Sequence, residues 1–250
     1  MLMNLMQESK INLNILLILL MFISMSWSRE FTVRLGTSYH NFSLKNIEEF
    51  QSLVALKLNQ QGIPVKIVDK FPSYFGVEIQ FLTKIKNNSY IGFYYGYLST
   101  GGRIHYQDYS GEVKIDQVIS GNSVGIYSQF AFYHHKVDLS IFSKFSMIFL
   151  HLKNQEYYQF LNQVEKLNST FSGFLGGLTP GFKAEFSFGH FSFAGFISYR
   201  FTPETDLNRG EKANFLFLDN TINQIRVSWN GWSVGISLGI IFELDKIPLF

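Results

Sequence analysis

Apolar side chains stand at every second position near the end of the chain, and glycine or serine fills most of the places between them. The apolar row consists of Val234, Ile236, Leu238, Ile240 and Phe242. A period of two residues places successive side chains on opposite faces of a β-strand. One apolar row opposite a small or polar row fits a closed barrel in lipid. The sequence therefore predicts a lipid-facing last strand.

The same alternation recurs along the chain and predicts eight strands. We expect them near Glu30–His40, Ser73–Lys86, Asn88–Ser99, Gly121–His134, Lys136–Leu150, Ser169–Phe188, Phe191–Thr202 and Ile225–Glu243. The gaps alternate in length, with long ones near 41–72, 100–119, 151–168 and 203–224. Transmembrane barrels have short periplasmic turns and long external loops. The predicted fold class is an all-β, eight-stranded, antiparallel up-and-down transmembrane β-barrel.

Two local signals modify this fold. Asn230-Gly231 is a pair typical of two-residue hairpins, so a count of nine or ten strands is the alternative. The first long gap has apolar residues at helical spacing from Ile47 to Leu58, and Gly62 with Pro64 ends the run. We expect a short helical insertion at about 45–62 that packs on the barrel rim. A lid over the barrel mouth and a partner-binding helix are the alternatives.

Composition and the first residues favour an exported membrane protein. The chain has 250 residues with 27 Phe and 13 Tyr, and only 16% of its residues are charged. No stretch after the N-terminal segment has the roughly 20 apolar residues that a membrane helix needs. Residues 1–28 have the pattern of a cleaved signal peptide, leaving a barrel domain at 29–250, and an uncleaved anchor is the alternative. A net charge of +2 gives no basis for nucleic-acid binding, and the absence of cysteine excludes disulfides.

The leading segment, the eight alternating stretches and the rhythm of the gaps resemble small outer-membrane β-barrels of the OmpA/OmpX type from Gram-negative bacteria. The resemblance covers about residues 29–243. It implies the bacterial outer membrane, contact with its lipid, and insertion by the barrel insertion machinery. Ser99–Glu112 also resembles a segment of uncharacterised members, to which no function is attached. The terminal aromatic that such machinery recognises is either Phe242 or Phe250, because Pro248 interrupts the alternation before Phe250.

The predicted inner faces carry charged residues. They are Glu78, Lys84, Asp138, Lys144, Lys183, Glu185 and Arg200. An eight-stranded barrel is just wide enough for its own side chains. Unpaired ions would be costly there, so we expect a paired network that fills the lumen. A narrow proton or ion path is the alternative.

Three further sets of residues could carry chemistry or anchor the chain. His190, Ser192 and Glu204 resemble the His-x-Ser and Glu of outer-membrane lipid A deacylases, but strand seven would separate the acid by roughly 45 Å. His105, Asp108 and Glu112 match no known metal-ligand spacing. We therefore expect no enzyme, no metal and no cofactor. Trp229 and Trp232 are expected as anchors at the membrane interface.

The sequence thus favours a non-enzymatic envelope protein. Its expected role is structural, or the binding of an extracellular ligand or protein through long external loops. The alternatives are a lipid-modifying enzyme of the outer leaflet, resembling a lipid A deacylase, and a carrier of a small hydrophobic ligand beneath the 45–62 helix.

Overall fold

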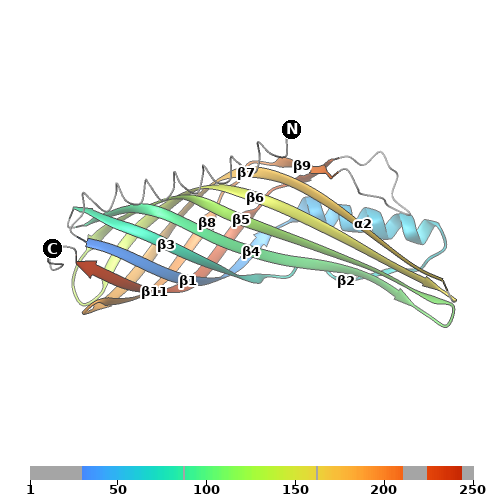
Figure 1. The fold of residues 1–250 in the computed structure, drawn as a ribbon, viewed down its shortest axis with the longest axis horizontal. Helices are drawn as coiled ribbons and strands as arrows, with labels where there is room; N and C mark the ends of the chain where they lie inside the picture. The colour runs from blue at the N-terminus through green and yellow to red at the C-terminus, as the bar shows by residue number, and fades with distance from the viewer. Residues whose placement is uncertain (1–29, 87, 162, 211–223, 244–250) are drawn as a thin grey trace, which may run out of the picture.

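Eight long strands close into a hydrogen-bonded ring (Figure 1). The computed structural model describes residues 30–86, 88–161, 163–210 and 224–243, so the predicted signal peptide and Phe250 lie outside the described residues. The ring consists of β1 (Glu30–Ser43), β3 (Tyr74–Lys86), β4 (Ser89–Gln107), β5 (Gly111–Tyr133), β6 (Asp138–Phe160), β7 (Gln163–Phe188), β8 (Phe191–Arg200) and β11 (Asn230–Glu243). Each strand pairs antiparallel with the next, and β11 closes the ring on β1. The predicted eight-stranded up-and-down barrel is confirmed.

Four smaller elements lie at one end of the ring. Helix α2 (Lys45–Gln60) follows β1, as predicted, and β2 (Lys66–Asp69) pairs with β4. Strands β9 (Thr205–Arg209) and β10 (Gln224–Val227) pair with each other, and β9 also pairs with β7. In the part of the chain that is described, no helix is long and apolar enough to cross a membrane.

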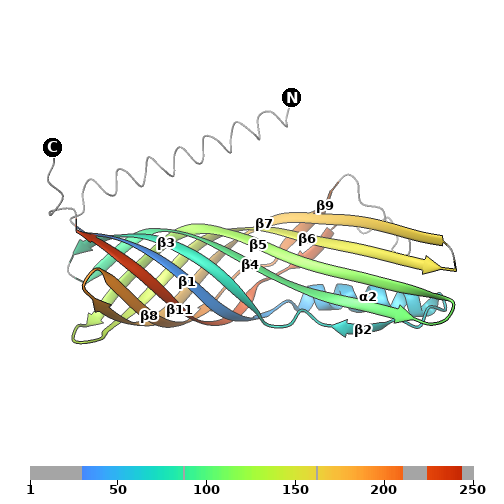
Figure 2. The same cartoon turned by 60° about the horizontal axis from the view of Figure 1, so that its bottom comes forward.

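Strands β4 to β7 continue well beyond the rest of the ring. The prediction of long loops at 100–119 and 151–168 is wrong, because β4 and β5 are separated only at 108–110, and β6 and β7 only at 161–162. Figure 2 shows these four strands running past the barrel as a curved sheet over α2. We call this part, from residue 98 to residue 121 and from 150 to 173 with α2, β2, β9 and β10, the extension. The three short connections lie at the other end of the barrel, as predicted.

The last strand is interrupted where a single strand from Ile225 is predicted. β10 ends at Val227 and β11 begins at Asn230, and β10 pairs with β9 instead of folding back on β11. Asn230-Gly231 therefore forms no hairpin. Gly231 has a φ of +154°, and a Cβ there would lie 2.3 Å from the Asn41 carbonyl oxygen. Close approach of β1 therefore accounts for this glycine, and the ten-strand alternative does not describe the ring.

Candidate functional site

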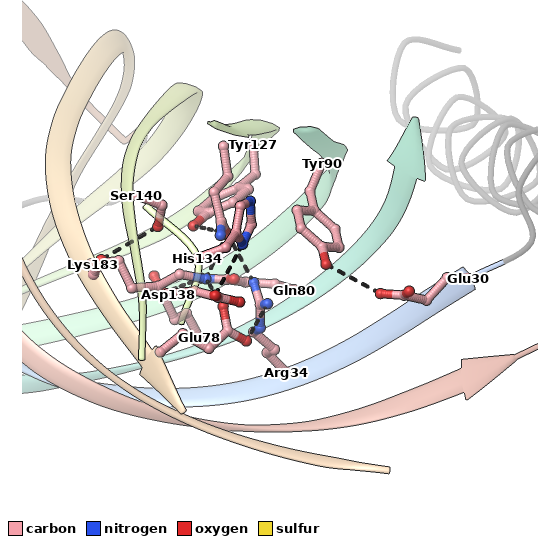
Figure 3. A network of polar contacts seen from close by, with 12 residues as sticks. Glu30, Arg34, Glu78, Gln80, Tyr90, Tyr127, His134, Asp138, Ser140 and Lys183 are labelled. Carbon is pink, nitrogen blue, oxygen red and sulfur yellow. Dashed lines mark hydrogen bonds and ion pairs between the residues drawn. The ribbon is translucent and has the colours of Figure 1, made fainter. Parts of the chain in front are cut away.

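The barrel interior holds a network of buried charges (Figure 3). Arg34 on β1 donates from Nη2 to Glu185 Oε1 at 2.5 Å and from Nη1 to Gln129 Oε1 at 3.1 Å. Lys183 lies 2.9 Å from Glu185 Oε2 and donates to Gln129 Oε1 at 2.6 Å. All four side chains are buried. Strands from opposite sides of the ring are thus joined through the lumen.

A second ion pair in the lumen joins the buried Lys144 to the partly buried Glu78. Lys144 Nζ lies 2.6 Å from Glu78 Oε2, and Gln80 donates to the other oxygen of Glu78 at 2.6 Å. The ammonium group also lies about 5.3 Å from the ring centres of Tyr94 and Phe196. The Glu78 carboxylate thus accepts from two donors, and the Lys144 ammonium faces two aromatic rings. These interactions stabilise both charges away from water.

The other predicted lumen residues lie away from this centre. Arg200 is buried and stacks over the Phe42 ring at 4.9 Å. Lys84 pairs with Glu30 at 2.7 Å, and both side chains are partly exposed. Asp138 pairs with His134 at 3.0 Å beside an exposed turn, where both are open to solvent. Four of the seven predicted residues thus lie at the centre of the lumen, Arg200 lies beside the core of the extension, and Lys84 and Asp138 lie at the barrel mouth.

Arg34, Gln80 and Gln129 were not among the predicted lumen residues. Each nevertheless stands in an alternating stretch, between outward-facing neighbours such as Leu35 and Phe130. The period-two pattern that identified the strands contains the signal for them. Their partners across the ring could not be inferred, because the register between strands sets those contacts.

Trp229 separates this polar lumen from the extension. It is fully buried, its indole nitrogen donates to the Tyr74 hydroxyl, and its backbone nitrogen donates to Thr202 Oγ1 at 2.7 Å. A Cβ on Gly121 would lie 2.8 Å from the Trp229 ring, so the strand facing it has no side chain there. The expectation that Trp229 anchors the membrane interface is therefore wrong.

The extension has an apolar core of its own. The inner faces of β4 to β7 contribute Ile104, Ile115, Ile119, Ile148, Leu150, Leu152 and Phe171. Helix α2 covers them with Ile47, Phe50, Val54 and Leu58, all buried. Gln51 donates to the Asp69 carbonyl at 2.9 Å, which fastens the helix to β2. A packed core of this kind is typical of a folded body rather than of mobile loops.

Polar groups close the core toward the far end of the extension. Tyr158 is buried and donates to Glu156 Oε2 at 2.7 Å, and Asn154 donates to Oε1 at 2.8 Å. Burial and the neighbouring Glu156 carboxylate raise the pKa of the Tyr158 hydroxyl. The hydroxyl therefore stays protonated and keeps donating to Glu156.

The outer face of the extension is polar. Register pairing places Arg103, Asp116, Gln155 and Asn168 in one row across β4 to β7. Arg103 Nε lies 2.5 Å from Asp116 Oδ1, and Lys114 Nζ lies 3.2 Å from Oδ2. Partial burial acts to raise the pKa of Asp116, but the hydrogen bonds from Arg103 and Lys114 outweigh it and lower the pKa. The face carries paired charges suited to water.

Comparison with known proteins identifies the fold. No family model and no curated protein matches the chain. The major outer membrane protein from Thermus thermophilus is similar in structure, with a TM-score of 0.50 and 9% identity over 85% of this chain and 98% of that one. The fold is that of an outer-membrane β-barrel. Ail of Yersinia pestis is also similar (TM-score 0.38, 13% identity, 86% and 99% covered), as is Neisserial surface protein A (0.41, 11%, 85% and 97%).

The outer surface of the outer-membrane barrel has a band of exposed apolar side chains. On β6 it runs from Leu139 through Phe145 to Phe149. Ten residue steps span roughly 33 Å along a strand, which a tilt of about 40° projects to about 25 Å, the height of a lipid-facing band. On β11, the five predicted lipid-facing residues point outward with exposed fractions of 44% to 64%.

The predicted catalytic and metal residues do not converge. His190 lies in the exposed turn between β7 and β8, with Ser192 buried just inside β8. Glu204 lies at the other end of the barrel, 3.5 Å from Asn46 of α2 (Figure 1). In the remaining set, His105 contacts Glu112 at 3.1 Å, while Asp108 bonds within its own turn. Among the described residues, no cluster of three His, Asp or Glu could hold a metal.

Proposed function

We propose that this chain is a non-enzymatic outer-membrane protein whose barrel carries a folded binding platform outside the membrane. The observation that supports the proposal is the apolar core between α2 and the extended strands, because binding residues are best held on a rigid scaffold. The barrel would cross the outer membrane after export, with its lumen filled by the buried network. Phe242, which points outward on β11, would serve the insertion machinery in competition with Phe250.

The platform test compares the full chain with a shortened barrel. The variant replaces 45–69, 99–120 and 151–172 with short turns and keeps the lumen network. Heat-modifiable gel mobility establishes that the barrel still folds. We expect cells displaying the full chain to bind beads coated with phospholipid, polysaccharide or protein, and cells with the shortened chain to lose that binding. Unchanged binding by the shortened chain, or no binding by the full chain to any bead, contradicts the platform.

The filled lumen has a separate test. Ion pairs in the lumen such as Lys144–Glu78 and Lys183–Glu185 occupy the space that a permeant ion would need. Purified protein in planar bilayers should therefore give no reproducible single-channel steps, and regular steps would contradict the plugged barrel.

The two alternatives receive less support from the geometry. An outer-leaflet deacylase would need His190 and Glu204 together, and they lie at opposite ends of the barrel (Figure 1). A carrier would need space beneath α2, where Trp229, Phe42 and Tyr74 pack against one another. Overexpression should leave the acylation of lipid A unchanged, and a change lost in His190→Ala and Ser192→Ala would favour the enzyme.

A further inference from the structure

The far end of the extension exposes apolar side chains on two adjacent hairpin tips. The β4–β5 turn carries Tyr109, which is fully exposed, and the β6–β7 turn carries Leu161, which is 82% exposed. The Leu161 backbone nitrogen donates to the Ser110 carbonyl at 3.2 Å, so the two turns are tied together. Phe160 and Val164 beside them are 40% and 55% exposed. We call these four residues the tip; Figure 2 shows the two turns side by side at the end of the molecule.

The backbone at the tip is unfavourable for the residue that it carries. Leu161 has a φ of +53°, in the left-handed region that favours Gly or Asn. A branched apolar side chain in this conformation, displayed to water, contributes nothing to the core beneath α2. Asn at this position would suit the turn better. Such an outlier points to a use for the exposed side chain rather than to a need of the fold.

A band of lysine and tyrosine lies just below the tip. Register pairing places Lys114, Tyr157 and Lys166 side by side on the outer face, and Lys166 Nζ lies 5.7 Å from the Tyr157 ring centre. Four residue steps from Tyr157 to Leu161 span roughly 13 Å. From the tip toward the barrel, apolar side chains come first, and lysine and tyrosine follow at that distance. A bilayer surface favours this order, since lysine reaches phosphate and tyrosine stays at the interface.

We infer that the tip inserts into the lipid surface of an apposed membrane or vesicle. The inference rests on the proposed platform and names its partner. The two turns stand at the end of the molecule (Figure 2), a position from which they reach a deformable lipid surface without a matching groove. Tyr109 and Leu161 enter the acyl boundary, while Lys114 and Lys166 meet the lipid phosphates. The charges near the tip have both signs, because Asp108, Glu112 and Glu165 accompany the lysines, so zwitterionic lipid suffices.

The experiment uses the full chain in nanodiscs, which cover the barrel band, mixed with phosphatidylcholine vesicles. Tyr109→Ser with Leu161→Asn should lower the apparent affinity for vesicles in flotation by about tenfold or more, since two apolar groups are lost. The matched control is Leu53→Ser with Leu56→Ser, which removes two leucines exposed to 54% and 53% on α2, and it should float like the unaltered chain. Because Asn suits the left-handed turn, Leu161→Asn should not lower resistance to unfolding.

Site-specific labelling adds a second readout. The chain has no cysteine, so a polarity-sensitive dye can be placed at Leu161→Cys, with Lys153→Cys lower on the same extension as the control. Vesicles should shift the emission at 161 to the blue and leave that at 153 unchanged. Equal flotation of the tip variant, or equal shifts at both positions, overturns the lipid inference. If the shortened barrel loses bead binding while the tip variant floats normally, the platform stands and the lipid inference fails.

Discussion

Trp229 and Trp232 are only three residues apart in the sequence, yet their surroundings differ. Trp229 is fully buried at the inner end of the extension, whereas Trp232 is 56% exposed and packs edge-on against Tyr199. Of the two, only Trp232 is therefore exposed on the outer surface of the barrel. One rule governs the lumen: a buried charge stabilises the barrel only where a group of opposite charge faces it across the ring.

Glu185 provides a test of that rule. Glu185→Gln removes the carboxylate that Arg34 and Lys183 share, leaving buried cations without compensation. We expect the free energy of unfolding to fall by about 3–5 kcal/mol, measured by urea unfolding in detergent. Glu30→Gln at the partly exposed Glu30–Lys84 pair is the control and should cost less than about 1 kcal/mol. Equal decreases in the free energy of unfolding would mean that the pair inside the lumen contributes no more stability than the pair at the rim.

Asp108 makes the β4–β5 turn sensitive to acid. Its carboxylate accepts hydrogen bonds from the Tyr106 hydroxyl and from Ser110, and these lower its pKa from 3.8 to about 2. Because the folded pKa is depressed, the contribution to turn stability is complete above pH 4 and is lost as the pH falls through 2. Amide exchange at Ser110 and Gly111 should accelerate over that range. Asp108→Asn should show little of this pH dependence, and an unchanged acid transition in that variant would contradict the assignment.

Helix α2 seals the core of the extension. Leu58→Ala removes a fully buried side chain and should lower the free energy of unfolding by about 2–5 kcal/mol. Limited proteolysis should then cut within 100–119 and 151–168, while heat-modifiable mobility shows that the barrel persists. Leu56→Ala, at a half-exposed position of the same helix, should leave the cleavage pattern unchanged. Cleavage that is equal in both variants would argue against a sealing helix.

The alternation within single strands predicted the ring of eight and the short turns, and helical spacing predicted the helix, but neither predicted the length of β4 to β7. Strand β6 explains the difference. Its apolar row lies outward at Phe145, Met147 and Phe149, then passes to the inner residues Leu150 and Leu152, with His151 and Lys153 outside. This change of face resembles the end of a strand in the sequence. Only the helix packed over the inner row explains why the strand continues.

Contacts between residues that are far apart in the sequence could not be predicted. The sequence indicated charges inside the barrel, yet it could not pair Lys144 with Glu78, 66 residues earlier. It also placed Trp229 at the lipid interface, because the sequence around Trp229 does not indicate that Gly121, on another strand, makes room for the indole ring. Such contacts depend on the register around the whole ring, which local alternation does not determine.

At the scale of the whole molecule, one continuous sheet serves two environments. From Leu139 to Phe149 of β6, the outer face is apolar and the lumen is charged. From Leu150 toward the tip, the outer face is polar and the inner face is apolar under α2. The outer-membrane barrel thus continues without a linker into a body with a polar outer face and an apolar core. The proposed platform and the inserting tip both depend on this reversal of polarity along β6.

Single-cysteine spin labels along β6 in lipid bilayers measure this reversal residue by residue, because the chain has no cysteine of its own. Labels at Ile141, Phe145 and Met147 should collide with oxygen dissolved in the lipid, and labels at His151, Lys153 and Gln155 with a water-soluble nickel reagent. We expect a single change from lipid-type to water-type accessibility between 147 and 151. Lipid-type accessibility that continues through 155, or water-type accessibility at 145, would contradict it.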